Sequence, residues 1–520
     1  MNYRLVIGRL GLLFGLLGLI MLATAALFAI AQSFGVRRDP DFTAVLALCI
    51  AGGVGILLAG LGWLAHRNAP GYLGRREALL LVAMSWLLGA ALAALPYWVW
   101  AHLNAEHVLH PFRSFVDCYF ESMSGLTTTG ATVLSDIEAM PHSLLLWRSL
   151  THWLGGLGIV VLFVAVLPGL GVGGKRLFNV EAPGPSPEGL QPHIRETARY
   201  LWYIYLGLTL AEIMLLWVFT PLDAFDSVCH TFATMATGGF STQNASIGAY
   251  ATTPMVDIIV ILFMVLAGMN FNLFYKIARG RGREVLRDTE LRVYLCLLAG
   301  GAALVSLALW MSPNAITMTT GDEISSTAGA AIRQGVFTTV SIQTTTGFAT
   351  SDFNAWPFLA QGVLVMLMFV GGCSGSTGGG VKVIRVWVAF KILLAEIEHI
   401  FRPHVVRPLR LGRSTMDIDL KLGTLAYLIG IIALFVIGSG AVMLLEQLND
   451  ASDCTYTTAA TATIASLCTI GPGLDQVGAT QNYGWFSGPS KAVLSVMMVL
   501  GRLEVFAIIV LFSPRFWRDV

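Results

Sequence analysis

Four short threonine–glycine stretches recur along this chain, and their residue types suit the binding of a cation. The stretches are "LTTTGATV" at 126–133, "MATGGFST" at 235–242, "QTTTGFAT" at 343–350 and "CTIGPG" at 468–473. Glycine has no Cβ atom and lets a backbone approach an axis closely. A ring of backbone carbonyls can then replace the hydration shell of a cation, and threonine hydroxyls offer further oxygen atoms.

A single Thr-Gly pair is an ordinary turn, and two such pairs, at 320–321 and 377–378, also occur here. The four stretches differ from these pairs because each follows a short apolar segment, precedes a long one and recurs at a similar interval. We therefore interpret them as four parts of one cation filter. The C-terminus of the preceding helix, where the helix dipole is negative, would favour a cation there.

The composition indicates a membrane as the surroundings of these stretches. The chain has 520 residues, of which 55% are hydrophobic and 12% charged, with a mean hydropathy of +0.71. Soluble domains average about 25% charged residues, and apolar runs of about 20 residues are typical of integral membrane proteins. The net charge of +1 suggests no polyanionic partner and no nucleic acid.

Ten long apolar segments and four short ones can be placed along the chain. The long ones lie near 10–32, 43–65, 77–101, 144–168, 199–220, 254–277, 291–312, 356–398, 421–446 and 489–513. The segment at 356–398 is too long for one span and is interrupted by a glycine run. The short ones lie near 113–127, 223–236, 329–344 and 453–468. They are too short for a hydrocarbon core of about 30 Å and are predicted to be re-entrant half-helices.

The order of segments predicts an all-α integral membrane fold with internal repeats. Two N-terminal helices occupy 1–68, where Gly11 and Gly15 are a weak helix-packing signal. Four helix–pore loop–helix repeats follow at 69–180, 181–280, 281–400 and 401–520, arranged pseudo-fourfold around one ion pore. Most of the 32 lysines and arginines fall on one side if the N-terminus is cytoplasmic, which favours that orientation and puts the threonine–glycine stretches outside.

The whole chain resembles the Trk/Ktr/HKT superfamily of potassium transporters, and within it the membrane subunit of bacterial Trk systems. The resemblance is carried by "TTTGAT", "ATGGFST", "QTTTGFATSDF", "TIGPGL", "GGCSGSTGGGVKVIR" and "GRLEVF". It implies a multi-pass protein of the bacterial inner membrane that takes up K⁺ through a gated, channel-like pore and is not an enzyme. Proton- or sodium-coupled symport stays open as the alternative mechanism.

The resemblance also implies which residues form the potassium filter. They are Thr128, Thr129 and Gly130; Ala236, Thr237 and Gly238; Thr345, Thr346 and Gly347; and Thr469, Ile470 and Gly471. Ala236 and Ile470 depart from an idealised Thr-Thr-Gly. Some plant relatives with serine at the first filter glycine are sodium-permeable, so Gly130 implies a preference for potassium.

The run "GGCSGSTGGGVK" at 371–382 cannot easily remain helical, because each glycine costs up to about 1 kcal/mol relative to alanine. Its non-helical backbone must line a cavity or be buried, and we interpret it as a mobile gate below the filter; a packing hinge is the alternative. The gate residues are Gly371, Gly372, Gly375, Gly378, Gly379, Gly380 and Arg502. Arg502 is predicted to lie at the same depth in the membrane as this glycine run. There it would hold the loop and repel cations, or else form a structural ion pair. Glu504 should face away and pair elsewhere.

A rival from another class is an intramembrane serine protease with Ser374 as nucleophile, since "GCSG" resembles the rhomboid motif. It would need His152 or His230 as a base. A separate question concerns Asp117, Asp226 and Asp453, which begin short segments and either attract cations or cap helices.

The partners follow from the resemblance alone. It implies a homodimer and a cytosolic ring subunit, TrkA, that binds nicotinamide and adenine nucleotides. No sizeable soluble domain is visible in this chain, so we expect the chain itself to bind no nucleotide. The basic stretches at 276–292 and 399–421 are either the docking surface for this subunit or merely follow the positive-inside rule.

Overall fold

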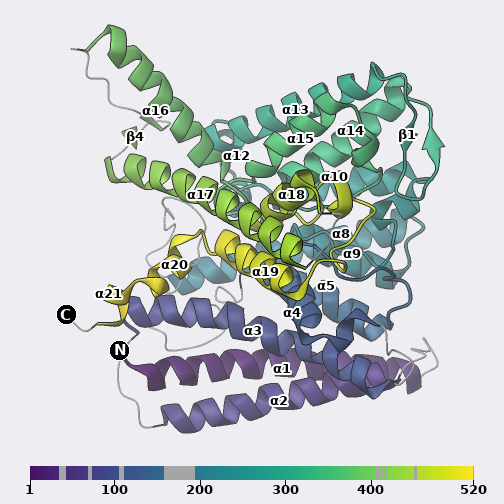
Figure 1. Ribbon diagram of the computed structural model, residues 1–520, viewed down its shortest axis with the longest axis vertical. Helices are drawn as coiled ribbons and strands as arrows, with labels where there is room; N and C mark the ends of the chain where they lie inside the picture. Colours follow the sequence, from purple (N-terminus) through teal and green to yellow (C-terminus); the bar gives the residue numbers. More distant parts are fainter. Residues whose placement is uncertain are drawn as a thin grey trace.

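The computed structural model describes residues 1–33, 42–67, 73–104, 110–156, 158, 194–403, 410–411, 414–415, 418–449 and 454–518. Within these ranges helices dominate (Figure 1). Four two-residue strands form two antiparallel hairpins, in which β1 (Ile316–Thr317) pairs with β2 (Glu323–Ile324) and β3 (Arg410–Leu411) with β4 (Ser414–Thr415). The prediction of a helical protein is confirmed for these residues.

Six described helices are long and apolar enough to cross a membrane. They are α1 (Tyr3–Ser33), α2 (Phe42–His66), α3 (Arg75–Leu103), α8 (Ile194–Phe219), α13 (Thr289–Trp310) and α17 (Ile418–Leu448). Each coincides with a predicted long segment, because a run of about 20 apolar residues is what the hydrocarbon core requires.

The other four predicted long segments are not continuous helices in the part of the chain that the structure describes. The predicted segment at 144–168 overlaps α5 (His142–Gly156). Of its remaining residues only 158 is among those that the structure describes. The remaining three are α10 (Pro254–Ala267) with α11 (Phe271–Ala278), α15 (Phe358–Phe369) with α16 (Val383–Phe401), and α19 (Gly488–Arg502) with α20 (Phe506–Ile509). The sequence predicted only the second of these three interruptions, so continuous helices at 254–277 and 489–513 were wrong.

Tertiary contacts explain the two unexpected breaks. Helices α10 and α11 meet at 94°, and the Phe271 N–H at the bend donates to the Gly375 carbonyl at 3.0 Å. After α19, Glu504 and Val505 both have positive φ angles, 52° and 67°, and Glu504 forms an ion pair with Arg385 of α16. A break inside a membrane is tolerated when other parts of the protein satisfy the freed backbone groups, and such partners cannot be read from apolar periodicity.

The four predicted short segments are helices of 12 or 16 residues. They are α4 (Phe115–Leu126), α9 (Ala224–Met235), α14 (Ala328–Gln343) and α18 (Tyr456–Leu467). Asp223, Thr327 and Thr455 each cap a helix by accepting a backbone N–H three residues later. Such caps satisfy donors that a helix start otherwise leaves unpaired, and they fix where α9, α14 and α18 begin.

Shorter elements connect these helices and follow the last of them. They are η2 (Pro111–Arg113), η3 (Ser246–Tyr250), α12 (Gly282–Val285), η4 (Phe353–Ala355), η5 (Asp475–Val477), η6 (Val510–Phe512) and α21 (Pro514–Trp517). The two ends of the chain lie on the same side of the molecule in Figure 1.

Helices α1 and α2 lie side by side against α3 at one end of the molecule (Figure 1). Their backbones approach closely because glycines face each other: a Cβ atom on Gly62 would lie 2.8 Å from the Gly11 Cα atom. One on Gly15 would lie 2.8 Å from the Ala59 Cβ atom. The packing signal at Gly11 and Gly15 is therefore confirmed, in line with the role of small residues between membrane helices.

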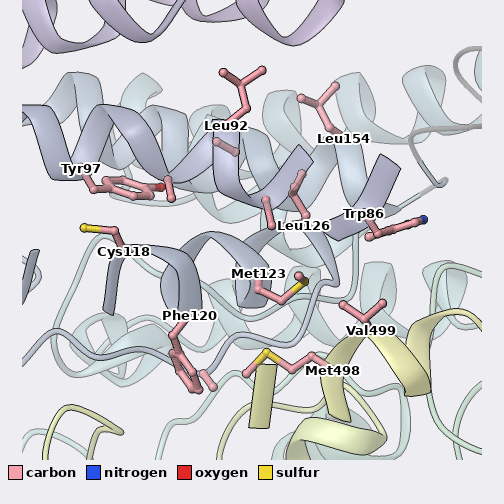
Figure 2. Close-up of a cluster of buried hydrophobic side chains, with 14 of the residues drawn as sticks. Trp86, Leu92, Tyr97, Cys118, Phe120, Met123, Leu126, Leu154, Met498 and Val499 are labelled. Atoms are coloured by element: carbon pink, nitrogen blue, oxygen red, sulfur yellow. The ribbon is translucent and has the colours of Figure 1, made fainter. Parts of the chain in front are cut away.

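Helix α4 is enclosed by α3, α5 and α19, and Figure 2 shows the side chains that fill this region. Phe120, Met123 and Leu126 of α4 are fully buried, as is Met498 of α19. Within a membrane, a short helix with polar groups at both ends is stable only when protein surrounds it. The enclosure thus holds the C-terminus of α4 in a defined place.

We expect Gly62→Val to lower the thermal midpoint of the detergent-solubilised protein, because overpacking typically costs ~1–3 kcal/mol. Gly60→Val is the matched control, since Gly60 lies in the same helix and a Cβ atom there meets nothing within 4 Å. Equal midpoints for the two variants would contradict the close packing of α1 on α2.

Candidate functional site

The loops that follow α4, α9, α14 and α18 share one backbone conformation. In each, a threonine two residues after the helix lies in the left-handed region: Thr128, Thr237, Thr345 and Thr469 have φ angles of 56°, 54°, 61° and 54°. Left-handed conformations are rare for β-branched residues. Because this rare conformation occurs at the matching position in all four loops, the four loops share one backbone structure.

A glycine two residues further on is also left-handed in every loop. These glycines are Gly130, Gly239, Gly347 and Gly471, with φ angles of 82°, 80°, 81° and 96°. Between threonine and glycine, the middle residue donates its N–H to the carbonyl five residues earlier, at 2.8–2.9 Å. The donor–acceptor pairs are Thr129–Ser124, Gly238–Ala233, Thr346–Ser341 and Ile470–Ala465.

This geometry shifts the register of the second loop by one residue from the sequence interpretation. Ala236 is the C-cap of α9, and Thr237, Gly238 and Gly239 match Thr128, Thr129 and Gly130 of the first loop in backbone conformation. The sequence pattern matches Gly238 with Gly130 and does not identify Gly239, so this part of the prediction is wrong. The doubled glycine in "ATGGF" was the available signal, but two adjacent glycines do not reveal which one is left-handed.

The left-handed glycine of each loop lies against a carbonyl of the next loop. A Cβ atom on Gly130 would overlap the Gly238 oxygen, and one on Gly239 would overlap the Thr346 oxygen. The first loop thus touches the second, and the second touches the third, through equivalent atoms.

The remaining two contacts continue the same series. A Cβ atom on Gly347 would overlap the Ile470 oxygen, and one on Gly471 would lie 2.6 Å from the Thr129 oxygen. The fourth loop therefore returns to the first, and the four contacts form a closed circuit. Only glycine fits these positions, because they combine positive φ with close backbone approach.

The chemistry that these loops offer is that of oxygen atoms. Thr128, Thr237, Thr345 and Thr469 are fully buried, and within the described residues no N–H or O–H group donates to their carbonyl oxygens. Buried carbonyls are rarely left unpaired, so these are available to water or a cation. The described residues contain no group of three or more His, Cys, Asp or Glu side chains suited to a metal.

An isolated parallel β-bridge between Val370 and Val381 joins the two ends of the glycine-rich loop at 370–382. The Gly371 N–H donates to the Val381 carbonyl at 2.9 Å, and the Val381 N–H donates to the Phe369 carbonyl at 3.1 Å. Between these ends, the Cys373 N–H donates to the Gly268 carbonyl at 2.8 Å. The loop is therefore attached to the break between α10 and α11.

The same loop touches two of the threonine–glycine loops. The Gly379 N–H donates to the Thr345 hydroxyl at 2.7 Å, and a Cβ atom on Gly379 would overlap the Thr469 hydroxyl. A Cβ atom on Gly378 would lie 3.2 Å from the Thr344 oxygen. Glycines here allow the chain to pass directly beside the third and fourth loops.

Arg502, the last residue of α19, joins this loop to α5. Its guanidinium donates to the Thr377 carbonyl at 2.8 Å and to the Gly156 carbonyl at 2.8 Å, and also to the Gly155 carbonyl. Glu504 instead pairs with Arg385 of α16. The predicted contact between Arg502 and the loop and the separate pairing of Glu504 are both present.

The protease interpretation finds no support in the geometry of the described histidines. The ring nitrogens of His152 lie 2.8 Å from the Gly125 carbonyl oxygen and 3.2 Å from the Phe240 N–H group. Those of His230 lie 2.8 Å from the Asp226 carbonyl oxygen and 2.9 Å from the Ser241 hydroxyl. Each ring is engaged by its local backbone or hydroxyl partners, so neither is free to act as a base for Ser374.

The acidic residues at the starts of short helices have different roles. Asp117 forms an ion pair with Lys491 of α19 at 2.5 Å. Asp226 accepts from the Thr242 hydroxyl at 2.8 Å, while Asp223 provides the cap of α9. Asp453 lies outside the described residues. Capping by Asp117 or Asp226 is therefore not what the structure has.

The segments that follow the first and second threonine–glycine loops are also linked to each other. The Asn244 side chain donates to the Asp136 carboxylate at 3.0 Å, and this hydrogen bond lowers the pKa of Asp136. The Asn244 N–H donates to Glu138 at 3.0 Å. The linkage keeps negative charge beside the first and second loops.

Comparison with known proteins gives consistent matches over almost the whole chain. Residues 50–519 match the family model TrkH, described as a cation transport protein. The Trk system potassium uptake protein TrkH of Halomonas elongata is 36% identical over 525 residues, which cover 100% of both chains. Its namesake in Escherichia coli (strain K12) is 36% identical over 468 residues, 90% of this chain and 91% of the relative.

A solved structure is similar over the full length. The crystal structure of the potassium transporter TrkH from Vibrio parahaemolyticus superposes with a TM-score of 0.82 at 31% sequence identity, covering 100% of both chains.

We expect Thr345→Val to lower the thermal midpoint of the purified protein, because it leaves the buried Gly379 N–H unpaired at a cost of ~1–3 kcal/mol. Valine keeps the shape of threonine, so the hydroxyl alone is tested. Thr128→Val is the matched control, since the buried Thr128 hydroxyl has no hydrogen-bond partner in the described part of the chain. A loss of equal size in both variants would refute the link between Thr345 and the glycine-rich loop.

Proposed function

Because this chain belongs to the TrkH family of cation transport proteins, we propose that it takes up potassium across a bacterial inner membrane through a gated, channel-like pore. Family membership confirms the resemblance drawn from the sequence motifs. The proposal carries over potassium uptake, the activity named for the relatives from Halomonas elongata and Escherichia coli. The N-terminus is cytoplasmic in this proposal.

The observation that carries the proposal is the closed circuit of contacts among the four threonine–glycine loops. Four equivalent loops that meet in a circuit support a pseudo-fourfold filter built from the four predicted repeats. The filter residues in this proposal are the predicted ones of the first, third and fourth loops, with Thr237, Gly238 and Gly239 in the second loop, where the backbone conformation excludes Ala236. Each loop follows the C-terminus of a short helix, whose dipole favours a cation.

The gate in this proposal is the glycine-rich loop together with Arg502. Support comes from the hydrogen bond between Arg502 and Thr377 and from the contacts of Gly379 with Thr345 and Thr469. Within the membrane an unpaired guanidinium costs at least ~2.5–3.5 kcal/mol. Binding to carbonyls of both the loop and α5 compensates that cost while keeping a positive charge below the filter.

Potassium symport with protons or sodium is the second candidate mechanism. Glu212 favours it, because this carboxyl is fully buried in α8 and intramembrane carboxyls are typical of proton relays. The two mechanisms differ in radioactive rubidium uptake by liposomes that contain only this protein. A channel gives the same permeability with and without an imposed proton gradient, whereas a proton symporter is driven by the gradient and loses that response in Glu212→Gln.

The proposed assembly is a homodimer with a cytosolic nucleotide-binding subunit similar to TrkA. This chain contributes no nucleotide site in the proposal. The basic stretch at 276–292 is the proposed docking surface within the described residues, together with the stretch at 399–421, part of which lies outside them.

We expect Gly130→Ser to reduce the preference for potassium over sodium by about tenfold, equivalent to ~1.4 kcal/mol of differential stabilisation. The added side chain collides with the Gly238 carbonyl and distorts the circuit. The measurement is the ratio of potassium to sodium permeability in liposomes. Gly321→Ser controls for backbone strain, because Gly321 has a φ of +90° but open space around it; an unchanged ratio in Gly130→Ser would count against a filter role.

We expect both Arg502→Ala and deletion of 378–380 to raise rubidium flux in the absence of any partner protein, because each weakens the closed gate. Arg333→Ala is the control, since this arginine contacts Asp257 and the Ala251 carbonyl and not the loop. If both gate variants reconstitute intact and neither raises flux above the parent, the gate assignment fails.

A further inference from the structure

The segment that leaves each threonine–glycine loop is held from behind by a side chain of the preceding short helix, and the four holding groups differ in chemistry. In the second loop His230 contacts the Ser241 hydroxyl at 2.9 Å. In the third, Ser341 donates to the Phe348 carbonyl at 2.6 Å. In the fourth, the Thr461 hydroxyl accepts from the Leu474 N–H at 3.0 Å.

In the first loop the holding group is a carboxylate. Glu121 accepts the Val133 N–H at 2.9 Å and the Thr132 hydroxyl at 2.9 Å. It stands seven residues before Thr128, as His230 stands seven before Thr237. Glu121 is fully buried and pairs with the Arg148 guanidinium, 3% exposed, at 2.7 Å. Of the four holding groups described here, this is the one that takes part in an ion pair.

Arg148 extends the contact into the second loop. Its guanidinium donates to the Ser241 carbonyl at 3.0 Å and lies 3.4 Å from the centre of the Phe240 ring. The planar guanidinium of Arg148 therefore binds the Glu121 carboxylate, which holds the first loop. It also binds the Ser241 carbonyl and the face of the Phe240 ring in the second loop. Lysine could not reproduce this, because its ammonium is a compact charge without a planar fork.

His152 lies one turn after Arg148 on α5 and supports the same junction. One ring nitrogen lies 2.8 Å from the Gly125 carbonyl at the end of α4, and the other accepts the Phe240 N–H at 3.2 Å. A Cβ atom on Gly238 would lie 2.6 Å from this ring. The carbonyl of Gly238 is the one that Gly130 touches in the circuit, so α5 supports the contact between the first and second loops from behind.

We propose that Glu121 and Arg148 are positioning residues that set the ion preference by fixing the separation of the first and second filter loops. The pair touches no filter carbonyl itself. It acts through Val133, three residues after the left-handed Gly130, and through Ser241, two residues after the left-handed Gly239. A buried ion pair is a rigid link because breaking it leaves an uncompensated charge. This inference rests on the proposed filter and deepens it.

The test compares Glu121→Gln, Arg148→Gln and Arg148→Lys with the parent in liposomes. The readouts are rubidium flux and the permeability ratio of potassium to sodium. We expect Glu121→Gln and Arg148→Gln to lower the ratio at least about tenfold, the change that ~1.4 kcal/mol produces. Arg148→Lys keeps the charge but loses the fork, and should give an intermediate ratio with flux retained.

Asp257→Asn is the matched control, because it breaks the Arg333–Asp257 ion pair between α14 and α10, which lies outside the four loops. It should leave the ratio unchanged. A parent without preference for potassium overturns the proposed function itself. If the parent is selective and the Arg148→Lys and Glu121→Gln variants are equally selective, the positioning role alone is overturned. If Glu121→Gln does not reconstitute, the ratio measured for Arg148→Lys decides.

Discussion

The close approach of a left-handed glycine in one loop to a carbonyl of the next is the constraint on which the rest of this structure depends. Four such contacts join the loops after α4, α9, α14 and α18 in a circuit. They leave no room for a side chain, so each loop must arrive at a closely defined position. The end of each short helix sets the position of the loop that follows it. The enclosure of α4 by α3, α5 and α19 therefore also fixes the position of the first loop.

The interrupted helices follow from the same crowding. Where α10 and α15 stop, their freed backbone groups pair with the glycine-rich loop, as in the contact of Cys373 with Gly268. Where α19 stops, Arg502 binds carbonyls of that loop and of α5. Each interruption supplies hydrogen-bond partners for another, so the interruptions form one interdependent region beneath the four loops and not separate defects.

The four loops keep one backbone and have diverged in what supports it. A carboxylate in an ion pair, an imidazole and two hydroxyls hold the outgoing segments in turn. Loops from four identical subunits could not differ in this way, whereas four loops within one chain can. The circuit therefore has chemically distinct junctions, and the junction between the first and second loops carries a buried ion pair that spans both.

The sequence by itself determined six of the long apolar helices, the four short helices and the threonine–glycine stretches, because these depend on local composition and spacing. It also determined that the run at 371–382 would not be helical. Only the tertiary structure decided that Gly239 and not Gly238 is left-handed, that 254–277 and 489–513 are interrupted, and that Arg148 links the first and second loops. Those features depend on which backbone groups meet across the fold, and contacts between distant segments leave no periodic trace in either segment alone.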